Sequence, residues 1–106
     1  MLAATYLEEK GWVIIERNWR ASRYEIDIIA SRNQILHFIE VKTRRSLSFG
    51  HPEESVSNKK MDSLMRGAEL FLEKRKGWNQ IQFDVLSITM LEGKPVEYFL
   101  IEDVYL

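Results

Sequence analysis

The sequence predicts a mixed α/β domain, in which helices pack on a central sheet in the element order α-β-β-β-α-β-β. Two stretches repeat apolar residues at helical spacing, and five stretches are rich in β-branched and aromatic residues. The chain has 106 residues, which suits one domain with one modest core. We therefore expect residues 1–106 to form a single domain.

The N-terminal part of the chain is expected to hold one short helix and three strands. Apolar residues recur at helical spacing across 2–7, and Gly11 is placed to end that helix. Strand composition then marks 12–19, 25–31 and 35–44. The short polar link SRNQ joins the last two of these strands and favours a hairpin.

The C-terminal part is expected to hold one long helix and two strands. The segment 47–55 is predicted to be a loop, Ser57 is a candidate N-cap, and the helix should end before Gly77. Its apolar stripe consists of Met61, Leu64, Met65, Ala68, Phe71 and Leu72. Two strands, 81–91 and 96–102, should flank a turn.

Composition excludes several classes of protein. The chain has no cysteine, which excludes disulfides and thiolate metal sites and favours a reducing compartment. It contains no apolar run of about 20 residues and no secretory leader. It also lacks a phosphate-binding glycine loop and a Ser-His-Asp set. We therefore expect a cytoplasmic protein with no membrane partner.

Basic residues are concentrated in one segment, although the net charge of the whole chain is only −1. Residues 17–45 contain seven basic and three acidic residues, whereas 61–106 contain five basic and eight acidic residues. This asymmetry suits a nucleic-acid-binding side, but an ordinary mixed surface can also produce it. The predicted nucleic-acid contacts are Arg17, Arg20, Arg44, Arg45 and Trp19, and packing in the core is an equal alternative for the tryptophan.

Charged residues interrupt two of the predicted strands. Side chains alternate along a strand, and a hairpin with an even-numbered link places Asp27 on the same face as Glu40. Glu25 and Lys42 should share that face. The opposite face of the first of these strands should carry Ile26, Ile28 and Ala30.

Carboxylates gathered at one strand end repel one another. A like-charge pair about 4 Å apart costs about 4 kcal/mol at an effective dielectric constant of about 20. One lysine cannot neutralise three acids, whereas Mg²⁺ or Mn²⁺ with hard oxygen ligands can. The alternative is a solvated strand end with weak surface ion pairs, each contributing about 0–1 kcal/mol.

The spacing of Asp27 and the run Glu40-Val41-Lys42 resembles the PD-(D/E)xK nuclease superfamily. More narrowly, the blocks YLEEKGWVIIERNWR, EIDIIA, FIEVKTRR, FGHPEESVSNKK and FDVLSI resemble the YraN-like family of small bacterial proteins. The resemblance covers about Ala3 to Ile88. It implies a restriction-endonuclease-like fold, with a mixed central sheet flanked by helices.

The resemblance also implies roles for individual residues. Asp27 and Glu40 would bind Mg²⁺ or Mn²⁺, and Lys42 would orient the attacking water or stabilise the phosphoryl charge. Glu25 matches a glutamate that the family usually carries. The implied activity is metal-assisted hydrolysis of DNA, with a homodimer expected by analogy. The alternatives are a non-catalytic nucleic-acid-binding module on the same fold and a purely structural adaptor.

The sequence departs from the family pattern in two places. Tyr24 stands where the family usually has glycine, and its side chain is expected to narrow the site. Relatives also usually carry Gly-Glu just before the segment matching Met1–Leu7, so we expect a few natural residues to precede Met1.

Three further residues have competing interpretations. His37 lacks an HxxxH-type partner and is predicted to face away from Glu40, so we expect a packed histidine and no zinc site. Lys59 and Lys60 begin the long helix, where anions are favoured. Solubility explains this pair of lysines equally well.

Overall fold

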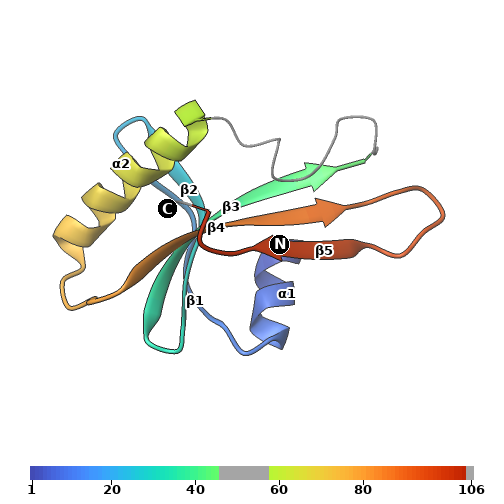
Figure 1. The fold of residues 1–106 in the computed structure, drawn as a ribbon, viewed down its shortest axis with the longest axis horizontal. Coiled ribbons are helices and arrows are strands. Elements are labelled where there is room, and N and C mark those ends of the chain that lie inside the picture. Colours follow the sequence, from blue (N-terminus) through green and yellow to red (C-terminus); the bar gives the residue numbers. More distant parts are fainter. Residues whose placement is uncertain (46–57, 105–106) are drawn as a thin grey trace.

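The computed structural model describes residues 1–45 and 58–104. The elements are α1 (Leu2–Glu9), β1 (Val13–Ala21), β2 (Tyr24–Arg32), β3 (Ile35–Arg44), α2 (Asn58–Lys74), β4 (Ile81–Thr89) and β5 (Glu97–Ile101). This order confirms the predicted succession of helices and strands (Figure 1). The predicted loop at 47–55 and the Ser57 cap lie outside the described residues, as does His51.

The five strands form one mixed sheet in the order β1-β2-β3-β4-β5. The pair β3–β4 is parallel, and every other neighbouring pair is antiparallel. A parallel pair needs a long crossover connection, and α2 lies within the connection between β3 and β4. The sheet therefore agrees with the mixed α/β class that the sequence predicts.

The two helices cover opposite faces of the sheet (Figure 1). Helix α1 buries Ala3, Ala4 and Leu7, together with Trp12. Helix α2 buries Leu64, Ala68 and Phe71 from its predicted stripe. At Gly67, an added Cβ would lie 3.2 Å from Ile26 side-chain atoms, so the glycine allows α2 to approach β2 closely. None of the described helices is long and apolar enough to cross a membrane.

The side chains of β2 do not alternate strictly between the two faces of the sheet, so the prediction that Ile26 and Ile28 share one face is wrong. Ile26 packs in the cluster with α2, whereas Ile28 packs with α1 on the other face. On β1, Arg17 pairs with Ile28 and Trp19 pairs with Ile26. Between these partners lies Asn18, whose φ of +49° is in the left-handed region that asparagine tolerates better than most residues. The break in β2 therefore lies opposite this left-handed residue, whereas the register shift of the β1–β2 pair lies further along, between Ile14 and Glu16.

Candidate active site

Asp27 lies where β2 separates from β3. The pairing of these strands ends at Ile28 opposite Ile39. Two residues further along β3, the backbone N–H of Val41 donates a hydrogen bond to Asp27 Oδ2 over 2.8 Å. A side chain thus takes the place of the missing main-chain acceptor. This bond holds the Asp27 carboxylate against the end of β3 that carries Glu40.

The predicted acids gather around one pocket. The pocket has a volume of about 280 Å³. Its lining residues are Glu25, Asp27, Glu40, Lys60, Ser63 and Leu64. Two strands supply the carboxylates, and the first two turns of α2 supply the opposite wall. The structure thus brings the three predicted acids to one place.

The pocket disfavours ionised Asp27. Burial is the largest cause that raises the pKa of Asp27 above its usual 3.8, and the charges of Glu40 and Glu25 raise it further. The hydrogen bond from Val41 and the charge of Lys60 act in the opposite direction. Additional positive charge in this pocket would therefore be favourable.

Two lysines contact the Glu40 carboxylate. Lys60 Nζ donates to Glu40 Oε1 over 3.0 Å, and Lys42 Nζ lies 4.0 Å from the same oxygen. Burial and then contact with Lys60 lower the pKa of the Lys42 ammonium. Contact with Lys42 is the main cause that raises the pKa of Lys60, with further support from Glu40. Lys60 therefore retains its proton more readily than Lys42.

Lys60 was not assigned to this site from the sequence. Its position at the start of a helix suggested anion binding or solubility, whereas its ammonium contacts a carboxylate. No periodic pattern identifies this contact, because it depends on how α2 is placed over the sheet.

Glu25 lies at the rim of the pocket. Its carboxylate forms an ion pair with Arg20 over 2.7 Å, and its side chain is partly exposed. Within the part of the chain that the structure describes, Glu25, Asp27 and Glu40 do not form a set whose ligand atoms all lie within 4.8 Å of one another. Glu25 is therefore placed to adjust the charge of the pocket rather than to complete a three-carboxylate cage.

The donor set fits a hard divalent cation. Asp27 and Glu40 each offer carboxylate oxygens, which Mg²⁺ and Mn²⁺ prefer. Mg²⁺ commonly takes one or two protein carboxylates and completes its shell with water and substrate phosphate. Two acids lining an open pocket meet that requirement without a third protein ligand.

The predicted nucleic-acid contacts do not share one environment. The Arg20 side chain is 75% exposed and pairs with Glu25, while Arg17 pairs with Glu8 of α1 over 3.4 Å. Arg45 is exposed. Arg44 is only 8% exposed, and its Nη2 is buried with no hydrogen-bond partner among the residues that the structure describes. The Arg44 side chain turns inward at the end of β3, so its surroundings differ from those of the exposed Arg20 and Arg45.

Trp19 is half-buried within the core beneath α2. Its ring packs edge-to-face on Phe71, with 5.3 Å between the ring centroids and 85° between the ring planes. Of the two interpretations of Trp19, the structure shows the packed one. Because the strand changes face at Asn18, Arg17 lies towards α1 and Trp19 towards α2.

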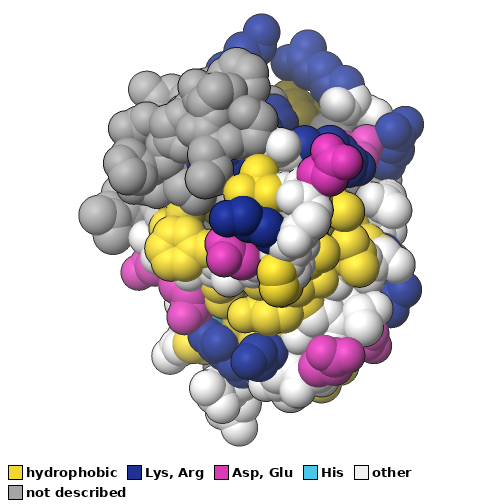
Figure 2. Space-filling view, turned by 90° about the vertical axis from the view of Figure 1, so that its right-hand side faces the viewer, with side chains coloured by type: hydrophobic (Ala, Val, Ile, Leu, Met, Phe, Trp, Pro, Cys, Tyr) yellow, Lys and Arg dark blue, Asp and Glu magenta, His cyan; other side chains and the backbone are white. Residues whose placement is uncertain are grey.

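Basic and acidic side chains are also interspersed on one end of the molecule. Figure 2 shows one end of the molecule, on which Lys, Arg, Asp and Glu side chains lie among apolar ones. Basic side chains gather along the upper edge of this view, and others lie at its centre and lower left beside acidic and apolar side chains. A nucleic-acid interface on this end would therefore be local rather than a broad basic face.

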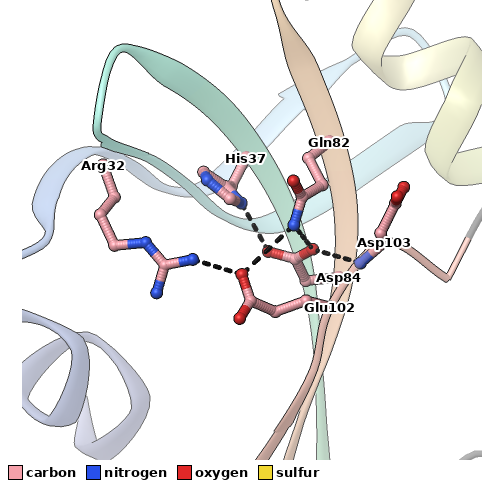
Figure 3. A network of polar contacts seen from close by, with 6 residues as sticks. All are labelled: Arg32, His37, Gln82, Asp84, Glu102 and Asp103. Carbon is pink, nitrogen blue, oxygen red and sulfur yellow. Dashed lines mark hydrogen bonds and ion pairs between the residues drawn. The ribbon is translucent and has the colours of Figure 1, made fainter.

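A second polar cluster lies on the other side of the sheet (Figure 3). His37 Nδ1 and Asp84 Oδ2 are 2.7 Å apart, and both side chains are buried. The other oxygen, Asp84 Oδ1, accepts bonds from Gln82 Nε2 over 3.0 Å and from the backbone of Asp103 over 2.9 Å. His37 is thus a packed histidine, as expected.

This cluster also contains three possible metal ligands. His37, Asp84 and Glu102 place ligand atoms within 4.8 Å of one another. However, Arg32 forms an ion pair with Glu102, and Gln82 donates to the same carboxylate over 3.3 Å. Protein donors therefore already satisfy these acids, and the cluster ties the chain after β5 to β4. Its sequence signal is Asp84, a lone acid inside an apolar strand.

A mixed α/β protein with acids and lysines converging at the end of its sheet is the class that this geometry defines. The chain belongs to the uncharacterised protein family UPF0102, whose model matches residues 1–88, and this confirms the YraN-like resemblance. The matched range includes every residue of the candidate site.

Relatives of high identity come from diverse bacteria. The chain is 46% identical over 97 residues to a UPF0102 protein of Nocardia farcinica, covering 90% of this chain and 76% of that relative. It is 43% identical over 94 residues to a UPF0102 protein of Syntrophomonas wolfei, and the match covers 88% of this chain and 82% of that relative. A third relative, from Clostridium perfringens, is 40% identical over 106 residues, which are 98% of this chain and 87% of that relative. The similarity therefore extends over most of each protein.

Proposed function

We propose that this protein is a divalent-metal-dependent nuclease that hydrolyses phosphodiester bonds in DNA, on a restriction-endonuclease-like PD-(D/E)xK fold. One observation carries the proposal. Asp27 and Glu40 line the same pocket at the end of the sheet, and Lys42 lies 4.0 Å from the Glu40 carboxylate. Acidic oxygens for a cation and a basic group for phosphate chemistry are therefore present together.

Each residue of the site has a distinct task in this proposal. Asp27 and Glu40 would hold Mg²⁺ or Mn²⁺, which when bound polarises the phosphate and lowers the pKa of water. The N–H of Val41 keeps the Asp27 carboxylate oriented. Lys42 would donate a hydrogen bond to the attacking water or to a phosphate oxygen. Burial and the contact with Lys60 lower the pKa of the Lys42 ammonium, so it gives up a proton more readily than an exposed lysine does.

Two exposed arginines, one at the pocket rim and one after β3, would supply contacts for the substrate backbone. Arg20 reaches the rim of the pocket through Glu25, and Arg45 directly follows β3, which carries Glu40 and Lys42. Phosphate contacts of this kind fix position without reading sequence. Binding should therefore depend on backbone geometry more than on base sequence.

A non-catalytic nucleic-acid-binding module is the second candidate. It is favoured by the contact between Lys60 and Glu40, which already neutralises one of the two proposed metal ligands. Such a site could bind DNA without cleaving it.

A cleavage assay separates the two candidates. Junction, flap and single-stranded DNA would be incubated with Mn²⁺ and the wild-type protein, the Asp27→Asn variant or the Asp62→Asn variant. Asp62 is an exposed acid of α2 paired with Arg66, so it controls for loss of one carboxylate.

Cleavage that disappears only in Asp27→Asn would support the nuclease. Binding of DNA without cleavage by the wild-type protein would favour the binding module. Equal cleavage by all three proteins would indicate a contaminating enzyme and remove support for catalysis at Asp27.

A further inference from the structure

We infer that the Lys60 ammonium is an internal counter-ion that a divalent metal must displace from Glu40, so that Lys60 sets the metal affinity of the site. This inference rests on the proposed function, because it assumes that Asp27 and Glu40 hold the metal. The direct observation is the 3.0 Å contact between Lys60 Nζ and Glu40 Oε1.

Lys60 reaches the site from a different layer of the fold. Glu40 belongs to β3, whereas Lys60 belongs to the first turn of α2, which crosses over the sheet (Figure 1). Both residues line the pocket that also contains Asp27. The lysine therefore brings positive charge to the place where the sequence pattern predicts a metal ion.

The ammonium and a metal ion compete for the same oxygen. A cation bound to Glu40 would lie within a few ångströms of the lysine nitrogen, where like charges repel strongly in a partly buried site. Lys42 adds a second positive charge 4.0 Å from that oxygen. Simultaneous contact of both lysines and a divalent ion with Glu40 Oε1 is therefore unfavourable.

Lys60 is able to leave this position. Its side chain is 50% exposed, whereas that of Glu40 is only 16% exposed. A half-exposed lysine loses little by returning to water, because surface ion pairs contribute little net stability. The carboxylate is largely buried in the pocket, whereas half of the Lys60 side chain is open to water. A counter-ion that a metal displaces needs this difference in exposure.

The neighbouring Lys59 provides a matched control. It carries the same charge on the same turn of α2 and is exposed. It lines a neighbouring pocket with Arg23 and Asp62 rather than the pocket that holds Asp27 and Glu40. Replacing Lys59 therefore changes the net charge equally without removing the contact with Glu40.

Isothermal titration calorimetry with Mn²⁺ tests the inference at fixed ionic strength. The proteins are the wild type, Lys60→Met, Lys59→Met and Asp27→Asn, each first checked for a native circular dichroism spectrum. Lys60→Met should bind Mn²⁺ about fivefold more tightly, as expected for release from a partly exposed ion pair. Lys59→Met should stay within about twofold of the wild type, because it lies outside the contact.

The outcomes distinguish this inference from the proposed function. If Asp27→Asn abolishes Mn²⁺ binding but Lys60→Met binds no more tightly than Lys59→Met, the counter-ion role is wrong and the metal site remains. If neither the wild type nor Lys60→Met binds Mn²⁺, both the proposed metal site and the counter-ion role of Lys60 are wrong. Binding detected only in Lys60→Met would support the inference most directly.

Discussion

The backbone N–H of Val41 donates to Asp27 Oδ2 over 2.8 Å, across the point where β2 and β3 stop pairing. A carboxylate thus replaces a backbone carbonyl as the acceptor. The bond favours the ionised form of Asp27, while burial and the neighbouring acids disfavour it by a larger amount. Asp27 is therefore well oriented but held in an environment that lacks sufficient positive charge.

This imbalance predicts a pH-dependent gain in stability for Asp27→Asn. Because the folded pKa of Asp27 is raised above 3.8, ionised Asp27 destabilises the fold above that folded pKa. The destabilisation disappears as the pH falls through the folded pKa towards 3.8. Asparagine retains an acceptor for Val41 without the charge, so it should be more stable than the wild type at neutral pH.

Urea denaturation between about pH 4 and 8 would measure the difference in the free energy of unfolding between the two proteins. The difference should shrink on acidification. The exposed control Asp62→Asn should show no comparable trend. A less stable Asp27→Asn at neutral pH, or a difference that does not vary with pH, would contradict the prediction.

The sequence identifies the two acids because their placement depends mainly on local geometry. Alternation and the short link between β2 and β3 are enough to bring Asp27 beside Glu40. The contact of Lys60 instead depends on how closely α2 packs on β2, which Gly67 permits. Such a tertiary contact leaves no periodic signal in the chain.

The break in alternation on β2 and the burial of Arg44 leave equally little signal in the sequence. Asn18 adopts a left-handed φ inside β1, and on the neighbouring β2 counting alternate positions places Ile26 on the wrong face. Arg44 is buried even though arginine is usually exposed. Neither a single left-handed residue nor one inward-facing arginine changes the composition or the periodicity of its strand.

The buried acceptor Asp84 is predicted to be essential for stability. It accepts hydrogen bonds from Gln82 and from the backbone of Asp103, and it contacts His37. Asp84→Ala removes the acceptor of the buried His37 and of the partly buried Gln82 and Asp103 N–H groups, so it should lower the free energy of unfolding by about 3 kcal/mol. Urea denaturation would measure this loss. Asp62→Ala, at an exposed position, should change it by no more than about 0.5 kcal/mol, and an equal loss in both variants would refute the role of the network.

DNA binding should respond to Arg45 and not to a matched cation far from the site. Arg45 is exposed and follows the strand that carries Glu40. Arg45→Ala should weaken binding and reduce the slope of log K against log salt by about 0.9, which corresponds to one lost phosphate contact. Lys76→Ala, at an exposed position after α2, should leave that slope unchanged. Fluorescence anisotropy at several salt concentrations measures both, and identical slopes in all three proteins would exclude Arg45 from the interface.

Lys42 should separate catalysis from metal binding. Its ammonium lies 4.0 Å from Glu40 Oε1 but supplies no metal ligand, so Lys42→Gln should retain Mn²⁺ affinity or increase it slightly. Loss of the charged donor should slow cleavage by about 10²-fold or more, as for other donors that stabilise a developing anion.

Single-turnover cleavage at saturating Mn²⁺, with calorimetry on the same samples, measures the two properties of Lys42→Gln separately. Lys59→Gln is the matched control and should cleave as the wild type does, because Lys59 lies outside the pocket. Asp27→Asn should lose both metal binding and cleavage, since it removes a proposed ligand. A Lys42→Gln protein that cleaves at the wild-type rate would show that Lys42 has no role in the chemical step, and a loss of Mn²⁺ binding in that variant would assign it to the integrity of the metal site instead.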